Sequence, residues 1–201
     1  MSDASLGGGL GVVFDRDADR AWYWTMLARS AHPLIHLCEP AAAIPRQGLL
    51  VRAEGLWAEH VCEAPYEQWT VANEVYGVEL DDPDDAVTHE RGVVVPLAFD
   101  LEWYATGSSI GVDDGYGQTG EVHGVLNVGE DVITLAGAPA WRTHRWNVDD
   151  PIIASSDEAG DAQDVGDGLR APIRLPSGVY DRQLAVSGWR WQRRAGDART
   201  R

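Results

Sequence analysis

The sequence predicts an all-β protein that folds as one antiparallel barrel, a single domain over residues 8–192. Two observations predict it: short runs of alternating apolar and polar residues recur along the chain, and turn-forming Gly, Asp and Asn residues separate them. The composition agrees, because 201 residues with 44% hydrophobic side chains and nine tryptophans suit one large core. We expect the basic stretch 193–201 to form a disordered tail.

The clearest strand pair lies between Trp69 and Tyr104. In its second arm, every second residue from Val95 to Trp103 is apolar, and acidic residues lie among those between them. This period of two is typical of a strand that is buried on one face. We therefore expect the two arms to pair as a central hairpin, with a capped, Pro-containing turn over residues 81–86.

The other strands are expected on the same grounds. They cover residues 10–14, 21–30, 33–38, 49–53, 56–62, 121–128, 131–136, 141–148, 171–175, 180–186 and 188–192. Trp22 and Met26 also fit one helical pair, but the polar turn before them and the aromatic residues around them favour a strand.

Several connections carry their own expectations. We interpret Glu54 and Gly55 as a bulge within a continuous extended run, because the apolar pattern resumes at once. Residues 107–120, rich in Gly, Ser and Asp, are expected to form a loop. Residues 149–168 combine acidic and small residues, so we expect a mobile acidic loop there.

Charge and sorting signals bear on the class of protein. A formal net charge of −16 repels phosphate backbones, so we expect no nucleic acid partner. No run approaches the ~20 apolar residues of a membrane span, and no secretory signal begins the sequence. The sequence therefore predicts a cytoplasmic protein with no membrane span.

Cys38 and Cys62 are expected to be free thiols, with Cys62 buried on the face that it shares with His60.

Two motif-like features predict no cofactor and no metal. Residues 115–120 match G-x-G-x-x-G, but a strand pattern follows where a nucleotide-binding fold needs a helix. The six histidines form no pair with a spacing typical of metal ligands. We therefore expect neither a nucleotide cofactor nor a metal ion.

Five short motifs occur in order along the chain. They are R-A-E-G-L-W at 52–57, Y-E-Q-W at 66–69, Y-G-V-E-L-D-D-P at 76–83, D-L-E-W at 100–103 and R-T-H-R-W-N at 142–147. Together, over about residues 8–191, they resemble the lipocalin-like proteins related to carotenoid hydratases of the hydroxyneurosporene synthase type, and the uncharacterised bacterial domains grouped with them.

This resemblance implies a lipocalin-like barrel whose apolar calyx holds a terpenoid- or polyketide-like ligand. Relatives typically carry R-D-H-S-W-G in the last motif, whereas this chain has Thr143, Arg145 and Asn147. The resemblance therefore supports the fold and the calyx better than any one reaction.

Candidate ligand contacts lie on the apolar face of the central hairpin and of the strands expected beside it. They are His60, Trp69, Asn73, Phe99, Trp103 and Trp146. Apolar walls with a few polar groups are typical of a ligand cavity. The alternative is a solid barrel, in which Asn73 and His60 bond to each other or to the backbone.

Arg142 and His144 share one face of their strand and are the candidate catalytic residues. An arginine and a histidine together are able to polarise a carbonyl group or carry a proton, with Glu102 as an orienting carboxylate. The alternative is that Arg142 and His144 form a charge-paired structural end of the strand.

The leading hypothesis is a protein that binds a hydrophobic small molecule, with turnover as a cofactor-independent hydratase, cyclase or isomerase left open. The competing hypothesis is a non-catalytic structural or partner-binding β-domain.

Overall fold

The computed structural model describes residues 6–17, 19–29, 32–80, 91–112, 115–146, 170–175, 178–185 and 188–193, and every regular element in them is a strand. The strands are β1 (Leu6–Asp15), β2 (Arg20–Arg29), β3 (Ile35–Ala42), β4 (Leu49–Ala53), β5 (Leu56–Ala64), β6 (Gln68–Leu80), β7 (Gly92–Ala105), β8 (Ile110–Val112), β9 (Gly115–Val128), β10 (Asp131–Arg145), β11 (Arg170–Leu175), β12 (Gly178–Ala185) and β13 (Gly188–Arg193). The predicted all-β class is confirmed. The same residues contain no helix that is long and apolar enough to cross a membrane.

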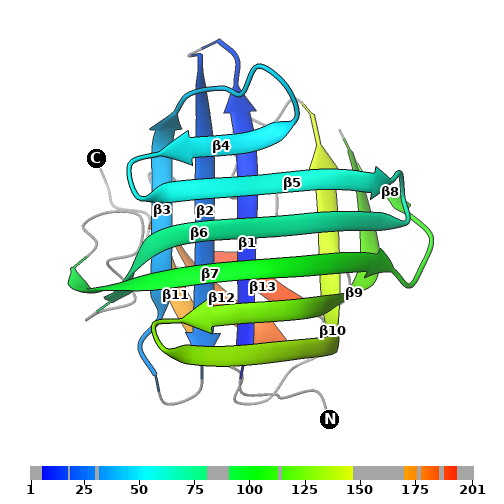
Figure 1. Ribbon diagram of the computed structural model, residues 1–201. Coiled ribbons are helices and arrows are strands. Elements are labelled where there is room, and N and C mark those ends of the chain that lie inside the picture. The colour runs from blue at the N-terminus through cyan, green and yellow to red at the C-terminus, as the bar shows by residue number, and fades with distance from the viewer. Residues whose placement is uncertain are drawn as a thin grey trace.

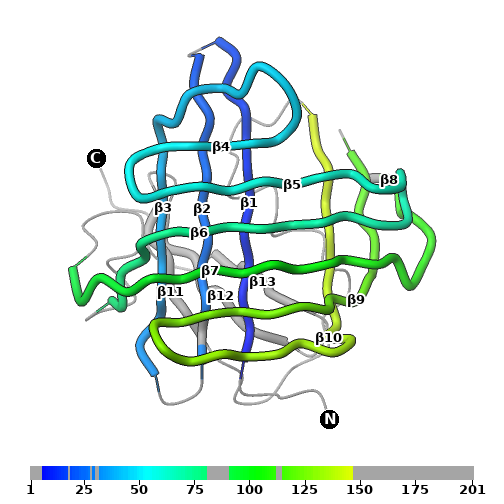
Figure 2. Tube along the Cα trace, in the orientation of Figure 1, coloured from blue at the N-terminus to red at the C-terminus, as the bar shows by residue number. Residues whose placement is uncertain are grey.

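Ten strands form one antiparallel sheet, which curls around its own core as a half-barrel. Its path runs β1-β2-β3-β6-β7-β9-β10, with β4 and β5 extending from β6, and β8 beside β9. Figure 1 shows β4 to β7 crossing in front of β1 to β3, and Figure 2 shows β9 and β10 bending from the front layer into a side wall. Strands β1 and β10 end the path without pairing to each other.

The last three strands form a separate sheet in the order β11-β12-β13. In Figure 1 they lie behind β1 to β3, and the backbone of β13 approaches both β1 and β10. The sequence placed these strands in the same barrel as the others, which is wrong. The outer face of β2 is buried as well as its inner face, since Trp24 and Met26 are buried although they face away from the core residue Tyr23.

The core lies on the concave side of the curled sheet, which we call the inner face. Its buried members are Ala21, Tyr23, Leu27, Ile35, Ala42, Val51, Leu56, Ala58, Val75, Leu97, Phe99, Leu126 and Val128. The predicted central hairpin is confirmed, since β6 pairs with β7 from Leu80 opposite Gly92 to Gln68 opposite Tyr104. The expected apolar face of β7 therefore points inward.

Residues Glu54 and Gly55 form a two-residue hairpin turn, not the predicted bulge. Ala53 pairs with Leu56 across the turn, and β4 and β5 run antiparallel from there. Gly55 has φ +68°, a backbone conformation that glycine adopts without steric cost. The apolar pattern resumes immediately because a two-residue turn interrupts it so briefly.

The predicted loop at 107–120 is also wrong in most of its length. It contains β8 and the first residues of β9. These residues of β9 pair with β8 on one side and with the end of β10 on the other. Residues 141–145 of the separate strand predicted at 141–148 are the continuation of β10 beyond a bulge at Gly137, which has φ +78°. The capped turn at 81–86, the acidic loop at 149–168 and the tail from residue 194 onward lie outside the described residues.

Candidate ligand-binding site

Arg142 lies among aromatic rings on the inner face of the curled sheet. Its guanidinium carbon is 4.2 Å from the ring centre of Trp69, 5.3 Å from that of Tyr116 and 5.8 Å from that of Trp103. At these distances the electron-rich ring faces attract the cation. The three rings, contributed by β6, β9 and β7, form a cage around one positive charge. We call Arg142, Trp69, Trp103 and Tyr116 the arginine cage.

Strand register assembles the arginine cage. Trp69 is directly opposite Trp103 in the β6–β7 pair, and Arg142 is opposite Gln118 in the β9–β10 pair. Gly120 makes room for the Trp103 indole, because a Cβ atom at residue 120 would lie only 2.3 Å from Cε2 of that ring. Gly120 is therefore a packing requirement of the cage.

The charge of Arg142 has no carboxylate partner within the part of the chain that the structure describes. By contrast, Arg20 pairs with Asp15 at 3.1 Å and Arg29 pairs with Asp131 at 2.9 Å. The Nη1 atom of Arg142 is buried and forms no hydrogen bond. Aromatic faces offset part of the cost of holding the buried part of this cation away from water.

Two histidines next to Arg142 are held in the neutral form. Burial, and then the positive charge of Arg142, lower the pKa of His60 to about 4. The same two causes, in the same order, lower the pKa of His144. The His144 ring also stacks on Tyr116, with ring centres 5.5 Å apart and planes 11° from parallel. At neutral pH the site therefore presents one cation and two uncharged imidazoles.

Tyr23 and Asn73 place a hydrogen bond across the core. Asn73 Nδ2 donates to the hydroxyl oxygen of Tyr23 at 2.9 Å, and burial raises the pKa of that hydroxyl. The Tyr23 ring also meets the His60 ring edge-on, with centres 6.4 Å apart. The pairing of Asn73 with His60, suggested for a solid barrel, is therefore replaced by contacts of both residues with Tyr23.

The inner face holds several buried polar atoms that have no hydrogen-bond partner within the protein. They are Nε2 of His60, Nε1 of Trp69, Oδ1 of Asn73, Nε1 of Trp103, Oε1 of Gln118 and Nη1 of Arg142. Buried polar atoms in folded proteins are nearly always paired with protein or water. Such a group in one region, on an otherwise apolar wall, is what a site for a bound molecule requires.

Most of the residues predicted from the sequence lie together on the inner face. His60, Trp69, Asn73, Phe99, Trp103, Arg142 and His144 share it, from strands β5, β6, β7 and β10. Trp146 follows the end of β10 and is 52% exposed, with its ring centre 6.0 Å from that of His144.

Two predicted placements are wrong. Glu102 lies on the outer face, exposed, and accepts a hydrogen bond from the Tyr104 hydroxyl at 2.9 Å, so it orients neither Arg142 nor His144. Alternation along β7 explains this, because Trp103 points inward. Cys62 is a free thiol but exposed, since its position lies near the end of β5, beyond the core.

Sequence reasoning missed Tyr23, Tyr116 and Gln118. Gln118 is 2% exposed, and its Nε2 donates to the carbonyl oxygens of Tyr66 and Gly107, both at 2.9 Å. The signal that reveals Tyr116 and Gln118 is their alternation with Gly115, Gly117 and Thr119, but the glycines of this stretch also predict a loop.

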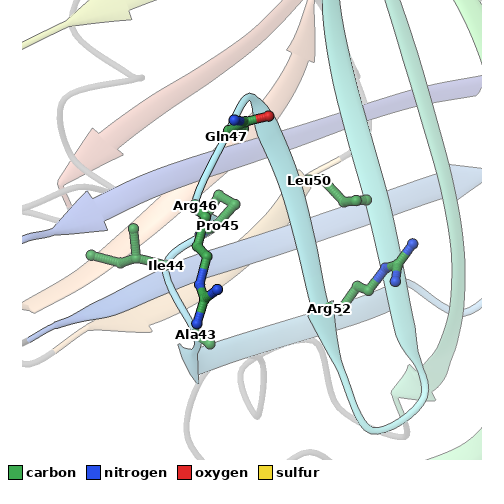
Figure 3. A pocket seen from close by; sticks show the side chains of 7 residues that line it. All are labelled: Ala43, Ile44, Pro45, Arg46, Gln47, Leu50 and Arg52. Atoms are coloured by element: carbon green, nitrogen blue, oxygen red, sulfur yellow. The ribbon is translucent and has the colours of Figure 1, made fainter.

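A hollow lies on the surface, around the connection between β3 and β4 (Figure 3). It measures about 250 Å³ and is lined by Ala43, Ile44, Pro45, Arg46, Gln47, Leu50 and Arg52. None of these residues belongs to the predicted site. Among the described residues, no group of three or more His, Cys, Asp and Glu side chains is placed to hold a metal ion.

Comparison with protein-family models, with curated proteins and with solved structures finds no match to this chain. The protein is described by its own fold and site: it is an all-β protein with a curled antiparallel sheet, and it has an arginine cage on the inner face of that sheet.

Proposed function

We propose that this protein is a lipocalin-like binder of a hydrophobic small molecule, held against the inner face of the curled sheet. The observation that carries the proposal is the group of unpartnered polar atoms on an otherwise apolar and aromatic wall. Apolar surface supplies most of the affinity in such sites, and a few polar groups fix the orientation of the ligand.

The chemistry of the wall favours a ligand with rings or conjugated double bonds. Trp69 and Trp103 face each other across β6 and β7, and Phe99 continues the same face of β7. Flat aromatic side chains stack well on flat ligand groups. A terpenoid- or polyketide-like molecule, the ligand class suggested by the sequence resemblance, fits this description.

Fluorescence quenching tests the proposal. Methyl retinoate, a neutral conjugated polyene, should quench tryptophan emission with saturation as it is titrated into the protein. Trp69→Phe should reduce the quenched fraction, because its indole lies on the inner face. Trp57→Phe is the matched control, because Trp57 is paired with the exposed Glu74 and faces outward. Equal loss of quenching in both variants, or no saturable quenching at all, would point instead to the structural or partner-binding domain.

A second candidate function is turnover of the bound molecule at Arg142 and His144. The observation that favours it is a neutral imidazole beside a fixed cation, since His144 is then able to accept a proton while Arg142 stabilises a developing oxyanion. Isomerisation, cyclisation or water addition on a carbonyl-bearing ligand that passes through an enolate uses these two steps and needs no redox cofactor.

The test of turnover compares two histidine variants. Extracts of small molecules would be incubated with each protein and followed by mass spectrometry. His144→Ala should abolish the conversion that the unaltered protein causes and leave methyl retinoate quenching intact. His123→Ala, on the outer face beside Glu121, should change neither. Conversion that survives His144→Ala would show that turnover does not depend on His144, and no conversion by the unaltered protein would leave binding as the sole function.

A further inference from the structure

We propose that Arg142 binds an anionic group, a carboxylate or a comparable oxyanion, at the polar end of the ligand. This inference rests on the proposed binding function and specifies the ligand class further. It places the flat apolar part of the ligand on the inner face and its negative charge at the arginine cage.

The first argument is that Arg142 has no carboxylate partner among the residues that the structure describes, although other arginines there have one. The sequence has 32 acidic side chains against 16 Lys and Arg. Arg20 and Arg29 both pair with aspartates, whereas the guanidinium of Arg142 contacts only rings among the described residues. A positive charge that pairs with no carboxylate of the described strands is available to an external one.

The second argument concerns the donors of Arg142. Aromatic faces stabilise a cation, but they leave the N–H groups of a guanidinium without the oxygen acceptors that match its planar fork. Nη1 of Arg142 is buried without an acceptor, and the side chain as a whole is only half-buried. A carboxylate that reaches the exposed part of the group accepts charge-assisted hydrogen bonds from the N–H groups that are exposed there.

The third argument is the charge of the surroundings. His60 and His144 are neutral beside Arg142, and Gln118, opposite Arg142 in the sheet, is also uncharged. Glu102, the acidic side chain next to Trp103 in sequence, points away. No other charged group among these neighbours competes with the ligand for Arg142, so one negative charge neutralises the site.

The experiment compares retinoic acid with methyl retinoate, which differ only in the charge of one end. Their dissociation constants would be measured by tryptophan quenching at pH 7.5 with the unaltered protein, Arg142→Gln and Arg20→Gln. Arg20 is the matched control because it also lies over an indole, 5.4 Å from the Trp22 ring centre, but already pairs with Asp15.

We expect the unaltered protein to bind the acid about 10- to 100-fold more tightly than the ester, the range for a hydrogen bond to a charged group. Arg142→Gln should remove this preference by weakening binding of the acid alone, and Arg20→Gln should retain it. Equal affinity for acid and ester in the unaltered protein overturns the inference but leaves the binding function standing. Absence of binding by both probes overturns both proposals. If Arg142→Gln fails to fold, the comparison of the two probes on the unaltered protein decides alone.

Discussion

Tyr23 and Asn73 show how single buried polar groups hold this fold together. Their hydrogen bond joins β2 to β6, two strands that are separated in the sheet by β3. Both side chains are almost completely inaccessible to water, so each depends on the other to satisfy its polar atoms.

Removal of the Tyr23 hydroxyl should therefore destabilise the protein. Tyr23→Phe leaves Nδ2 of Asn73 buried without an acceptor, and we expect the free energy of unfolding to fall by about 1–3 kcal/mol. Urea denaturation followed by circular dichroism measures it. Tyr76→Phe is the control, because Tyr76 is 62% exposed and its substitution should leave the unfolding free energy unchanged. An equal effect of the two substitutions would show that the buried hydrogen bond contributes nothing.

His60 should make stability depend on pH in a defined window. Its pKa is about 4 in the folded protein against 6.5 in a model peptide. As pH falls from 6.5 towards 4, the unfolded chain binds a proton that the folded protein does not, so the free energy of unfolding falls. By pH 5 this single group should cost about 2 kcal/mol relative to pH 7.

The measurement compares urea denaturation at pH 7 and pH 5 for the unaltered protein and His60→Gln. Glutamine does not titrate, so the difference between the two pH values should shrink by about 2 kcal/mol in the variant. The same pH dependence in both proteins would mean that His60 titrates normally in the folded state.

At the scale of the residue, much of the candidate site was predictable, because period two along a strand decides which side chains share a face. Trp69, Asn73, Phe99 and Trp103 follow from that rule. The position of Glu102 follows from it as well, which is why the expected orienting role fails: a neighbour of an inward residue points outward.

At the scale of the element, strand β9 shows why the loop predicted at 107–120 is wrong: the glycines there have a different role from the glycines of a turn. Glycine is depleted in strands and typical of turns, so a Gly-rich stretch predicts a loop. In β9 the glycines instead make room for large rings, Trp103 over Gly120 and Trp141 over Gly117. No local rule distinguishes these two uses, because the ring that needs the space comes from another strand.

Gly120→Ala tests this use of glycine. The added methyl group would lie 2.3 Å from Cε2 of Trp103, so we expect a loss of about 1–3 kcal/mol and a shift in tryptophan emission as the indole moves. Gly111→Ala, in the adjacent strand β8, is the control, since its added Cβ has no other heavy atom within 4 Å. Unfolding midpoints in urea compare the two. If Gly120→Ala is as stable as Gly111→Ala, the packing account of β9 is wrong.

At the scale of the whole molecule, the sequence predicted the all-β class but not how the strands divide between sheets. Alternation identifies strands one at a time, whereas the partner of a strand depends on contacts distant in sequence, such as β3 with β6. Strands β11 to β13 have the same local pattern as the rest and nevertheless form their own sheet. Both faces of β2 are buried, a feature that the alternation along this strand does not indicate.

The curled sheet places its arginine cage, its neutral histidines and its apolar core on one concave side, and the proposed function requires the ligand to lie there. Nuclear Overhauser contacts between unlabelled methyl retinoate and isotope-labelled protein test this most directly. The account predicts contacts from the ligand to the indoles of Trp69 and Trp103, and none to the outward-facing Trp57. Contacts to Trp57 without contacts to Trp69 or Trp103 would contradict it, because the ligand would then lie on the outer surface of the sheet.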